Sequence, residues 1–188
     1  MAIEAELKAR VRDSRHVRQL LGQRADEEAS VYADVYYDTP DHQLTSTGRE
    51  LRVRVIRTEA GSTTLLTYKD VTVDPGSGSK PETETAVDDL DAMSGILAGL
   101  GFEELIAFEK HCSNYRFTAR GLDLLATVAH IPELDETFIE IESLVDSHAE
   151  VGPTLDSIRG VLAELGLTRD DETTETYTDA VTSRRNLG

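Results

Sequence analysis

Apolar and charged residues alternate strictly near the start of the chain, over residues 3–11. Successive side chains of a β-strand point to opposite faces, so this alternation predicts a strand with one apolar and one charged face. The charged face carries two carboxylates followed by two bases, Glu4, Glu6, Lys8 and Arg10. The commonest reading of one such isolated strand is an amphipathic strand whose charged face is solvated.

The first half of the chain continues with a helix and three more strands. Asp13-Ser14 can cap a helix that runs to about residue 24. Strands are predicted at residues 29–38, 50–57 and 63–71. The Gly-, Ser- and Pro-rich segment 74–81 follows and predicts a mobile loop. It is not a P-loop, because it lacks the Gly-Lys-Ser/Thr ending and opens no helix.

The second half of the chain repeats this order of elements. It opens with an alternating strand at 82–87 that places Glu82 and Glu84 on one face, and a helix ending at Gly101 follows. Further strands are predicted at residues 104–110, 113–119, 122–129 and 137–144. A last helix is expected at 153–165, with Pro153 in its first turn.

Short turns join most of these strands, which favours antiparallel pairing, and so many short strands favour a barrel or a strongly curved sheet. We predict an α+β fold with a closed antiparallel β-barrel, flanking helices and two halves related by a pseudo-twofold axis. One domain is expected over residues 1–170. The polar tail, residues 171–188, is expected to pack poorly except around Tyr177.

Composition limits the class of protein. The length of 188 residues suffices for one large domain or two small ones, and no apolar run approaches a membrane span. Cys112 is the single cysteine, so no intrachain disulfide forms and a cytoplasmic location is expected. A protein without a basic patch is a poor candidate for nucleic-acid binding. We therefore expect neither a membrane nor a nucleic acid as partner.

The charge balance is extreme, with 36 acidic against 19 basic residues and a net charge of −17. Abundant acids with scarce lysine are typical of a protein adapted to high salt, which screens the self-repulsion. The lysines are Lys8, Lys69, Lys80 and Lys110. All but Lys80 fall in or beside predicted strands, so these three are candidates for a function, whereas Lys80 lies in the expected loop.

Five predicted strands carry a mixed charged face. Besides the first row these faces hold Glu50, Arg52 and Arg54, then Lys69, then Glu82 and Glu84, then Glu140 and Glu142. If the faces line a barrel interior, arginine and lysine can grip phosphate oxygens. Glutamates at i and i+2 can coordinate Mg²⁺ or Mn²⁺. The alternative is solvated faces with cross-strand ion pairs worth about 1 kcal/mol or less each. The pattern alone leaves both open.

In their order, these residues resemble the signature of the CYTH superfamily, the triphosphate tunnel metalloenzymes that include class IV adenylate cyclases and thiamine triphosphatases. The resemblance runs from residue 3 to about residue 165, and residues 175–179 look like the tail of the class IV cyclase branch. The matching motifs are Glu4-x-Glu6-x-Lys8, residues 37–41, Gly48, residues 51–54, residues 66–69, Glu82-x-Glu84, Lys110 and residues 138–142.

The resemblance implies an eight-stranded antiparallel tunnel whose interior binds a nucleoside or organic triphosphate with Mg²⁺ or Mn²⁺. By this resemblance the phosphate-binding residues would be Lys8, Arg52, Arg54, Lys69 and Lys110, with Lys8, Arg54 and Lys69 catalytic. The metal ligands would be Glu4, Glu6, Glu140 and Glu142, with Glu82 and Glu84 as further candidates. A homodimer is left open.

The chain departs from the family pattern at two places. The family usually has arginine two residues after the lysine matched by Lys110, where this chain has Cys112, and a thiol cannot neutralise phosphate. The family also places an aspartate on the strand before the last Glu-x-Glu, where this chain offers Thr127 and Ala129. The neighbouring His130 points to the opposite face and is more simply structural.

Three functions follow from the resemblance and its departures. The leading one is the reaction of class IV adenylate cyclases, in which ATP gives cyclic AMP and pyrophosphate. The second is hydrolysis of thiamine triphosphate, another organic triphosphate or inorganic tripolyphosphate. The third is a binding module that captures a polyphosphate or nucleotide without turnover, which the missing arginine and aspartate favour.

Overall fold

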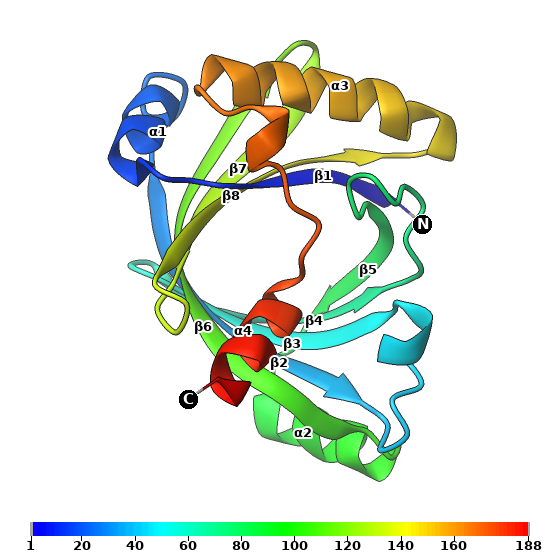
Figure 1. The fold of residues 1–188 in the computed structure, drawn as a ribbon. Helices are drawn as coiled ribbons and strands as arrows, with labels where there is room; N and C mark the ends of the chain where they lie inside the picture. Colours follow the sequence, from blue (N-terminus) through cyan, green and yellow to red (C-terminus); the bar gives the residue numbers. More distant parts are fainter. Residues whose placement is uncertain (1, 188) are drawn as a thin grey trace.

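Eight antiparallel strands close into a barrel in the computed structural model, which describes residues 2–187 (Figure 1). The strands are β1 (Ile3–Arg10), β2 (Glu28–Asp38), β3 (Glu50–Thr58), β4 (Gly61–Lys69), β5 (Lys80–Ala86), β6 (Glu103–Ala119), β7 (Leu122–Ile131) and β8 (Glu136–Val145). Around the barrel their order is β1-β5-β4-β3-β2-β6-β7-β8, and β8 pairs with β1 to close it. The predicted α+β fold with a closed antiparallel barrel is confirmed.

Helices cover the outside of the barrel and approach one of its openings. The helices are α1 (Ser14–Leu21), α2 (Leu90–Gly99), α3 (His148–Glu164) and α4 (Tyr177–Asn186), with short 3₁₀ turns at Thr45–Thr47 and Arg169–Asp171. The long helix α3 lies along β1 and β8, whereas α4 lies at the end of a strap that crosses the barrel opening (Figure 1). Among residues 2–187, no helix has both the length and the apolar character that a membrane span requires.

The two halves of the chain have the same order of elements. Each half begins with a strand and a helix and continues with three strands. Exchanging β1–β4 with β5–β8 reproduces the order of strands around the barrel. The predicted pseudo-twofold arrangement is therefore present in the topology.

The apolar face of β1 points outward, beneath helix α3. Ala5, Leu7 and Ala9 are buried in one cluster with Ile158 and Val161 of α3. Burying a side chain of the size of leucine, isoleucine or valine stabilises a fold by roughly 1.5–3 kcal/mol, so these contacts hold the strand in this orientation. Since alternate side chains point to opposite faces, the charged row of β1 faces the barrel interior.

Two predicted element boundaries differ from the structure. The predicted strands 104–110 and 113–119 form one continuous strand, β6, because it pairs with β2 on one side and β7 on the other. Helix α3 begins at His148 and not at Pro153, because Ser147 and Glu150 form a capping box one turn earlier. Pro153 lies inside the helix.

The segment 74–81, expected to be a mobile loop, is folded against the barrel. Ser79 is almost fully buried, and its hydroxyl accepts a hydrogen bond from the backbone of Glu6 at 3.2 Å. Gly78 has a φ of +82°, which a glycine adopts without strain and which allows the turn. Lys80 is the first residue of β5, so its expected placement in a loop is wrong.

The C-terminal tail is better packed than its polar sequence predicts. The backbone of Thr173 donates a hydrogen bond to the Lys8 carbonyl at 2.9 Å, and Glu172 forms a β-bridge with Ala9. In the helix that follows, Tyr177 is buried and Val181 has no exposed surface. The packing around Tyr177, which the sequence analysis excepted, extends to Val181, because the two residues lie four positions apart on one face of the helix.

Candidate functional site

A cavity of about 340 Å³ lies inside the barrel and is lined by charged residues, threonines and two tyrosines. Nine residues that the sequence analysis assigned to phosphate or metal line it: Lys8, Arg52, Arg54, Lys69, Lys110, Glu4, Glu6, Glu140 and Glu142. The charged faces of separate strands therefore converge on one enclosed space, and the solvated alternative does not hold for them.

All the lysines of this acidic chain line the same cavity. The fourth, Lys80, was expected to lie apart from the site, but it begins β5 at the cavity wall. Its ammonium donates hydrogen bonds to the Glu50 carboxylate at 2.6 Å and to the Gly48 carbonyl at 2.7 Å. Sequence reasoning missed Lys80 because the compact turn before β5 resembles a flexible loop, whereas Glu50 belongs to a predicted charged face.

Three residues of the predicted charged faces lie outside this lining. Glu82 on β5 reaches the cavity only through Lys69, whose Nζ is 3.0 Å from its Oε2. Glu84 is exposed, so the structure does not bring it to the other glutamates. Arg10 lies at the barrel rim, where it pairs with Glu175 of the tail at 2.5 Å.

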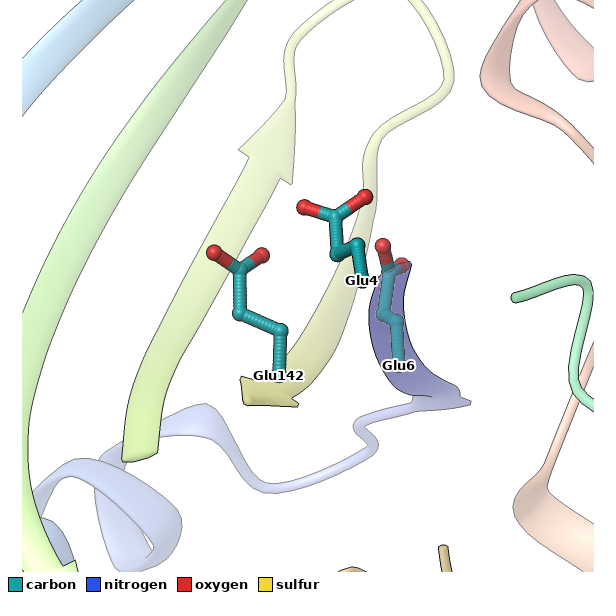
Figure 2. A group of neighbouring side chains, drawn as sticks. All are labelled: Glu4, Glu6 and Glu142. Atoms are coloured by element: carbon teal, nitrogen blue, oxygen red, sulfur yellow. The ribbon is translucent and has the colours of Figure 1, made fainter. Parts of the chain in front are cut away.

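Glu4, Glu6 and Glu142 form a cluster of carboxylates that point toward one another (Figure 2). The register of β1 and β8 places Glu6 directly opposite Glu142, and one carboxylate oxygen from each residue lies within 4.8 Å of the others. Burial and the charges of Glu140 and Glu4 raise the pKa of Glu6 to about 8. Burial and the charges of Glu4 and Glu6 raise the pKa of Glu142 well above its usual value.

This cluster fits a divalent cation. Carboxylate oxygens are the ligands that Mg²⁺ and Mn²⁺ prefer, and a bound cation would relieve the repulsion between buried like charges. It is also the one group of three or more potential metal ligands that the described part of the chain brings together. Glu140 is placed differently. Although burial opposes ionisation, the charges of Lys110 and Lys8 lower its pKa, so it lies on the basic side of the cavity.

Lys69 lies between the acidic cluster and β5. Its ammonium forms an ion pair with Glu4, lies 3.0 Å from Glu82 and reaches within 4.0 Å of Glu6. Burial alone would lower the pKa of Lys69, but these carboxylates raise it well above its usual value. The residue is therefore a cation that the surrounding acids hold in its charged form.

Arg52 is a buried cation with no carboxylate partner within residues 2–187. Its exposed fraction is 8%, and its Nε has no hydrogen-bond partner in that part of the chain. The guanidinium lies 5.9 Å from the centre of the Tyr36 ring. Because an unsatisfied buried charge is costly, this arrangement is suited to receiving an anion.

Asp34 is a member of the site that sequence reasoning missed. Its carboxylate accepts hydrogen bonds from Arg54 Nε at 2.6 Å and Nη2 at 2.8 Å, and Lys110 Nζ lies 3.5 Å away. Although burial opposes ionisation, these two cations hold the pKa of Asp34 well below its usual value. The signal was present in the sequence, because Tyr32, Asp34 and Tyr36 alternate on the inner face of β2.

The C-terminal tail supplies one end of the cavity. The Lys8 ammonium donates a hydrogen bond to the Glu175 carbonyl, and it lies 4.5 Å from the centre of the Tyr177 ring. Lys110 lies 4.7 Å from the centre of the same ring. Four threonines of the tail also face the cavity: Thr173, Thr174, Thr176 and Thr178.

The two positions that depart from the family pattern hold neutral side chains. Cys112 is buried, and burial raises the pKa of its thiol to about 11. Thr127 donates a hydrogen bond to Asn114 at 2.9 Å, and Ala129 is fully buried. His130 lines a separate groove outside the barrel cavity, so it does not replace the missing aspartate.

Comparison with known proteins gives the family. The sequence model of the CYTH domain matches residues 2–177. The chain is a member of the CYTH family. Members of this family bind triphosphate substrates and in general depend on a metal.

Relatives of this CYTH protein cover nearly all of its length. A protein of Methanocaldococcus jannaschii named "Putative adenylate cyclase MJ0240" is 24% identical over 177 residues, which cover 93% of this chain and 96% of the relative. The structure of PH1819 from Pyrococcus horikoshii is 25% identical and covers 97% of this chain and 99% of that one, with a TM-score of 0.84. HpAC1 from Hippeastrum, which is described as having a dominant triphosphatase activity, is 20% identical with a TM-score of 0.62 and covers 97% and 96%.

Proposed function

We propose that the protein is a metal-dependent enzyme that binds a nucleoside or other organic triphosphate in the barrel cavity, with the reaction of class IV adenylate cyclases. The observation that carries this proposal is the convergence of every lysine of a chain with net charge −17 on one cavity that also holds Arg52, which has no carboxylate partner within residues 2–187. A highly charged anion that reaches this cavity finds lysine and arginine side chains gathered there. The adjacent glutamate cluster supplies a place for a divalent cation.

The residues of the chain have separate tasks in this proposal. Arg52 and Lys8 bind phosphate oxygens, and Lys69 lies between the phosphates and the glutamate cluster. Glu4, Glu6 and Glu142 would hold Mg²⁺ or Mn²⁺, which supplies charge neutralisation at the phosphate oxygens when it is bound. Glu4, Arg52 and Lys110 are buried in the cavity wall, so each of their charge interactions is stronger than it would be at the surface.

Cyclisation of ATP requires one bond to form and one to break. The ribose 3′ oxygen bonds to the α-phosphorus, and the bond from this phosphorus to the oxygen it shares with the β-phosphorus breaks. Pyrophosphate leaves with the electron pair, and the proton of the 3′ hydroxyl passes to solvent. Lysine and arginine side chains that face the leaving group neutralise the charge that develops on it.

Hydrolysis of the triphosphate by water is the second candidate. HpAC1 shares the fold and is described as having a dominant triphosphatase activity, which favours water as the attacking group. Neutral Cys112 and Thr127, which replace charged residues of the family pattern, favour instead a binding module without turnover.

Incubation of the purified protein with ATP and Mn²⁺ at high salt separates these functions. Cyclic AMP and pyrophosphate, resolved by ion-exchange chromatography, are expected from cyclisation. Formation of ADP and orthophosphate would show hydrolysis in place of cyclisation. Tight binding of ATP without any product would indicate a binding module. The Lys8→Met variant is the control for contaminating activity, because its turnover is expected to vanish while the fold is retained.

A further inference from the structure

Asp34 is the most deeply buried carboxylate among those that face the tunnel cations. Its side chain has no exposed surface, and the side chains of Arg54 and Lys110 are 13% and 3% exposed. In the register of β2 and β3, Asp34 lies directly opposite Arg54. Lys110 on β6, the other neighbour of β2, also lies within 3.5 Å of its carboxylate, so both contacts are set by the strand register of the barrel.

Asp34 occupies the hydrogen-bonding edge of Arg54 that suits a phosphate. A guanidinium binds carboxylates and phosphates alike through two parallel N–H groups, and Nε and Nη2 of Arg54 are both engaged by Asp34. The Tyr32 ring, 4.5 Å from the guanidinium carbon, covers the face of the same group. A phosphate that approaches Arg54 therefore meets a guanidinium whose charge is neutralised by Asp34 and whose Nε and Nη2 groups are already hydrogen-bonded.

A buried cation pair without an anion would be costly to fold. Removing one partner of a buried ion pair is strongly destabilising, because the other charge is left uncompensated. Asp34 supplies the anion for Arg54 and Lys110 from within the chain. Arg52, by contrast, has no carboxylate partner within residues 2–187, so the cavity contains both an unneutralised cation and a neutralised pair.

We propose that Asp34 is an internal counter-ion that competes with the substrate's phosphate for Arg54 and Lys110 and so lowers the affinity of the tunnel for triphosphates. This inference rests on the proposed function. Asp34 acts through Arg54 and Lys110 and is a positioning residue that touches no substrate itself. The same competition lowers the affinity of the tunnel for the phosphates that the reaction releases. Affinity that is the same for substrate and transition state does not raise the turnover number. A carboxylate that limits this shared affinity is therefore useful.

The Asp34→Asn variant tests the proposal, because it keeps the size of the side chain and removes its charge. Affinity for inorganic tripolyphosphate is measured by titration calorimetry in excess Mg²⁺ at one fixed salt concentration. We expect binding at least tenfold tighter than in the wild type. Asp34→Glu, which keeps the charge, is expected to stay within about threefold of the wild type. Unchanged or weaker binding in Asp34→Asn would overturn the proposal.

Asp38 provides a matched control on the same strand. It is equally buried, but its carboxylate accepts hydrogen bonds from Thr45 and from the backbone of Thr39 and Leu44, and no cation contacts it within residues 2–187. Asp38→Asn is expected to lower the melting temperature without tightening tripolyphosphate binding. Equal tightening in both variants would contradict a role specific to Asp34.

A second comparison keeps the test valid if Asp34→Asn does not fold. Arg54→Gln leaves Asp34 with Lys110 as its one cationic neighbour among residues 2–187 and is expected to lose affinity. Adding Asp34→Asn to Arg54→Gln restores a neutral pair, so the double variant should bind tripolyphosphate at least tenfold more tightly than Arg54→Gln alone. Equal affinities would overturn the inference. Absence of tripolyphosphate binding by the wild-type protein would instead overturn the proposed function, and the inference with it.

Discussion

At the scale of single residues, Arg52 and Arg54 show that chemically identical neighbours can differ in availability. They lie two positions apart on β3 and both face the cavity. Arg54 is engaged by Asp34, whereas Arg52 has no carboxylate partner in the described chain. The free residue is the one from which phosphate affinity is expected to come.

Arg52→Gln is therefore predicted to weaken tripolyphosphate binding strongly. A hydrogen bond to a charged group contributes roughly 1.5–3 kcal/mol, which corresponds to about a ten- to hundredfold loss of affinity. Arg57→Gln is the matched control, because Arg57 lies on the same strand but points outward and pairs with Glu109 at 2.9 Å. Equal losses in the two variants, measured by titration calorimetry, would contradict the assignment of Arg52.

The thiol of Cys112 gives a prediction about pH. Burial raises its pKa to about 11, and only the thiolate reacts with alkylating reagents. The folded protein should therefore resist iodoacetamide from pH 7 to pH 9, while the unfolded chain, with an ordinary thiol pKa of about 8.5, reacts readily over this range. Mass spectrometry of samples with and without guanidinium measures the difference. Rapid modification of the folded protein at pH 8 would refute the neutral, enclosed thiol.

At the scale of elements, strand register decides which charged residues meet. The pairing of β1 with β8 places Glu6 opposite Glu142 and Lys8 opposite Glu140. The pairing of these two strands therefore places two opposed carboxylates next to an opposed lysine and carboxylate. A shift by one residue would turn each of these side chains to the apolar outer face, so the packing of α3 also protects the site.

Glu142→Gln is predicted to weaken Mn²⁺ binding at least tenfold, because it removes one of three clustered carboxylates. Glu84→Gln is the control, since Glu84 has the same side chain but is exposed on β5. Binding is measured by the loss of the electron paramagnetic resonance signal of free Mn²⁺. If Glu84→Gln weakened binding as much as Glu142→Gln, the cluster would not be the metal site.

At the scale of the whole molecule, the chain separates its charges between inside and outside. The lysines gather in the cavity, while the excess of acids that gives the net charge of −17 is left largely to the outer surface. The tail takes part in this arrangement, because its segment around Glu175 and Tyr177 closes one end of the cavity over Lys8. The result is an interior in which bases and acids are interleaved, within an acidic shell.

Stability is predicted to rise with salt concentration. The Debye length falls from about 30 Å at 0.01 M to about 3 Å at 1 M, so added KCl screens the repulsion between surface acids. We expect the melting temperature to rise by at least about 4 °C over this range, which corresponds to roughly 1–2 kcal/mol for a chain of this length. Differential scanning fluorimetry measures the shift. A constant or falling melting temperature would argue against adaptation to high salt.

The sequence by itself determined which faces of the strands are charged, because strand alternation is local and has a period of two. Glu4, Glu6 and Lys8 are readable as one row for this reason, and so is the pair Glu140 and Glu142. The strand pattern predicted a closed antiparallel barrel, the resemblance to the CYTH family implied the same fold, and both the family and the fold are confirmed.

Only the tertiary structure decided which charges are free. Asp34 neutralises Arg54 through cross-strand register, and Lys80 reaches the cavity because the turn before it folds against β1. Tyr177 reaches Lys8 and Lys110 from the far end of the chain. These contacts join residues distant in sequence, and their partners depend on barrel closure, which no local pattern encodes.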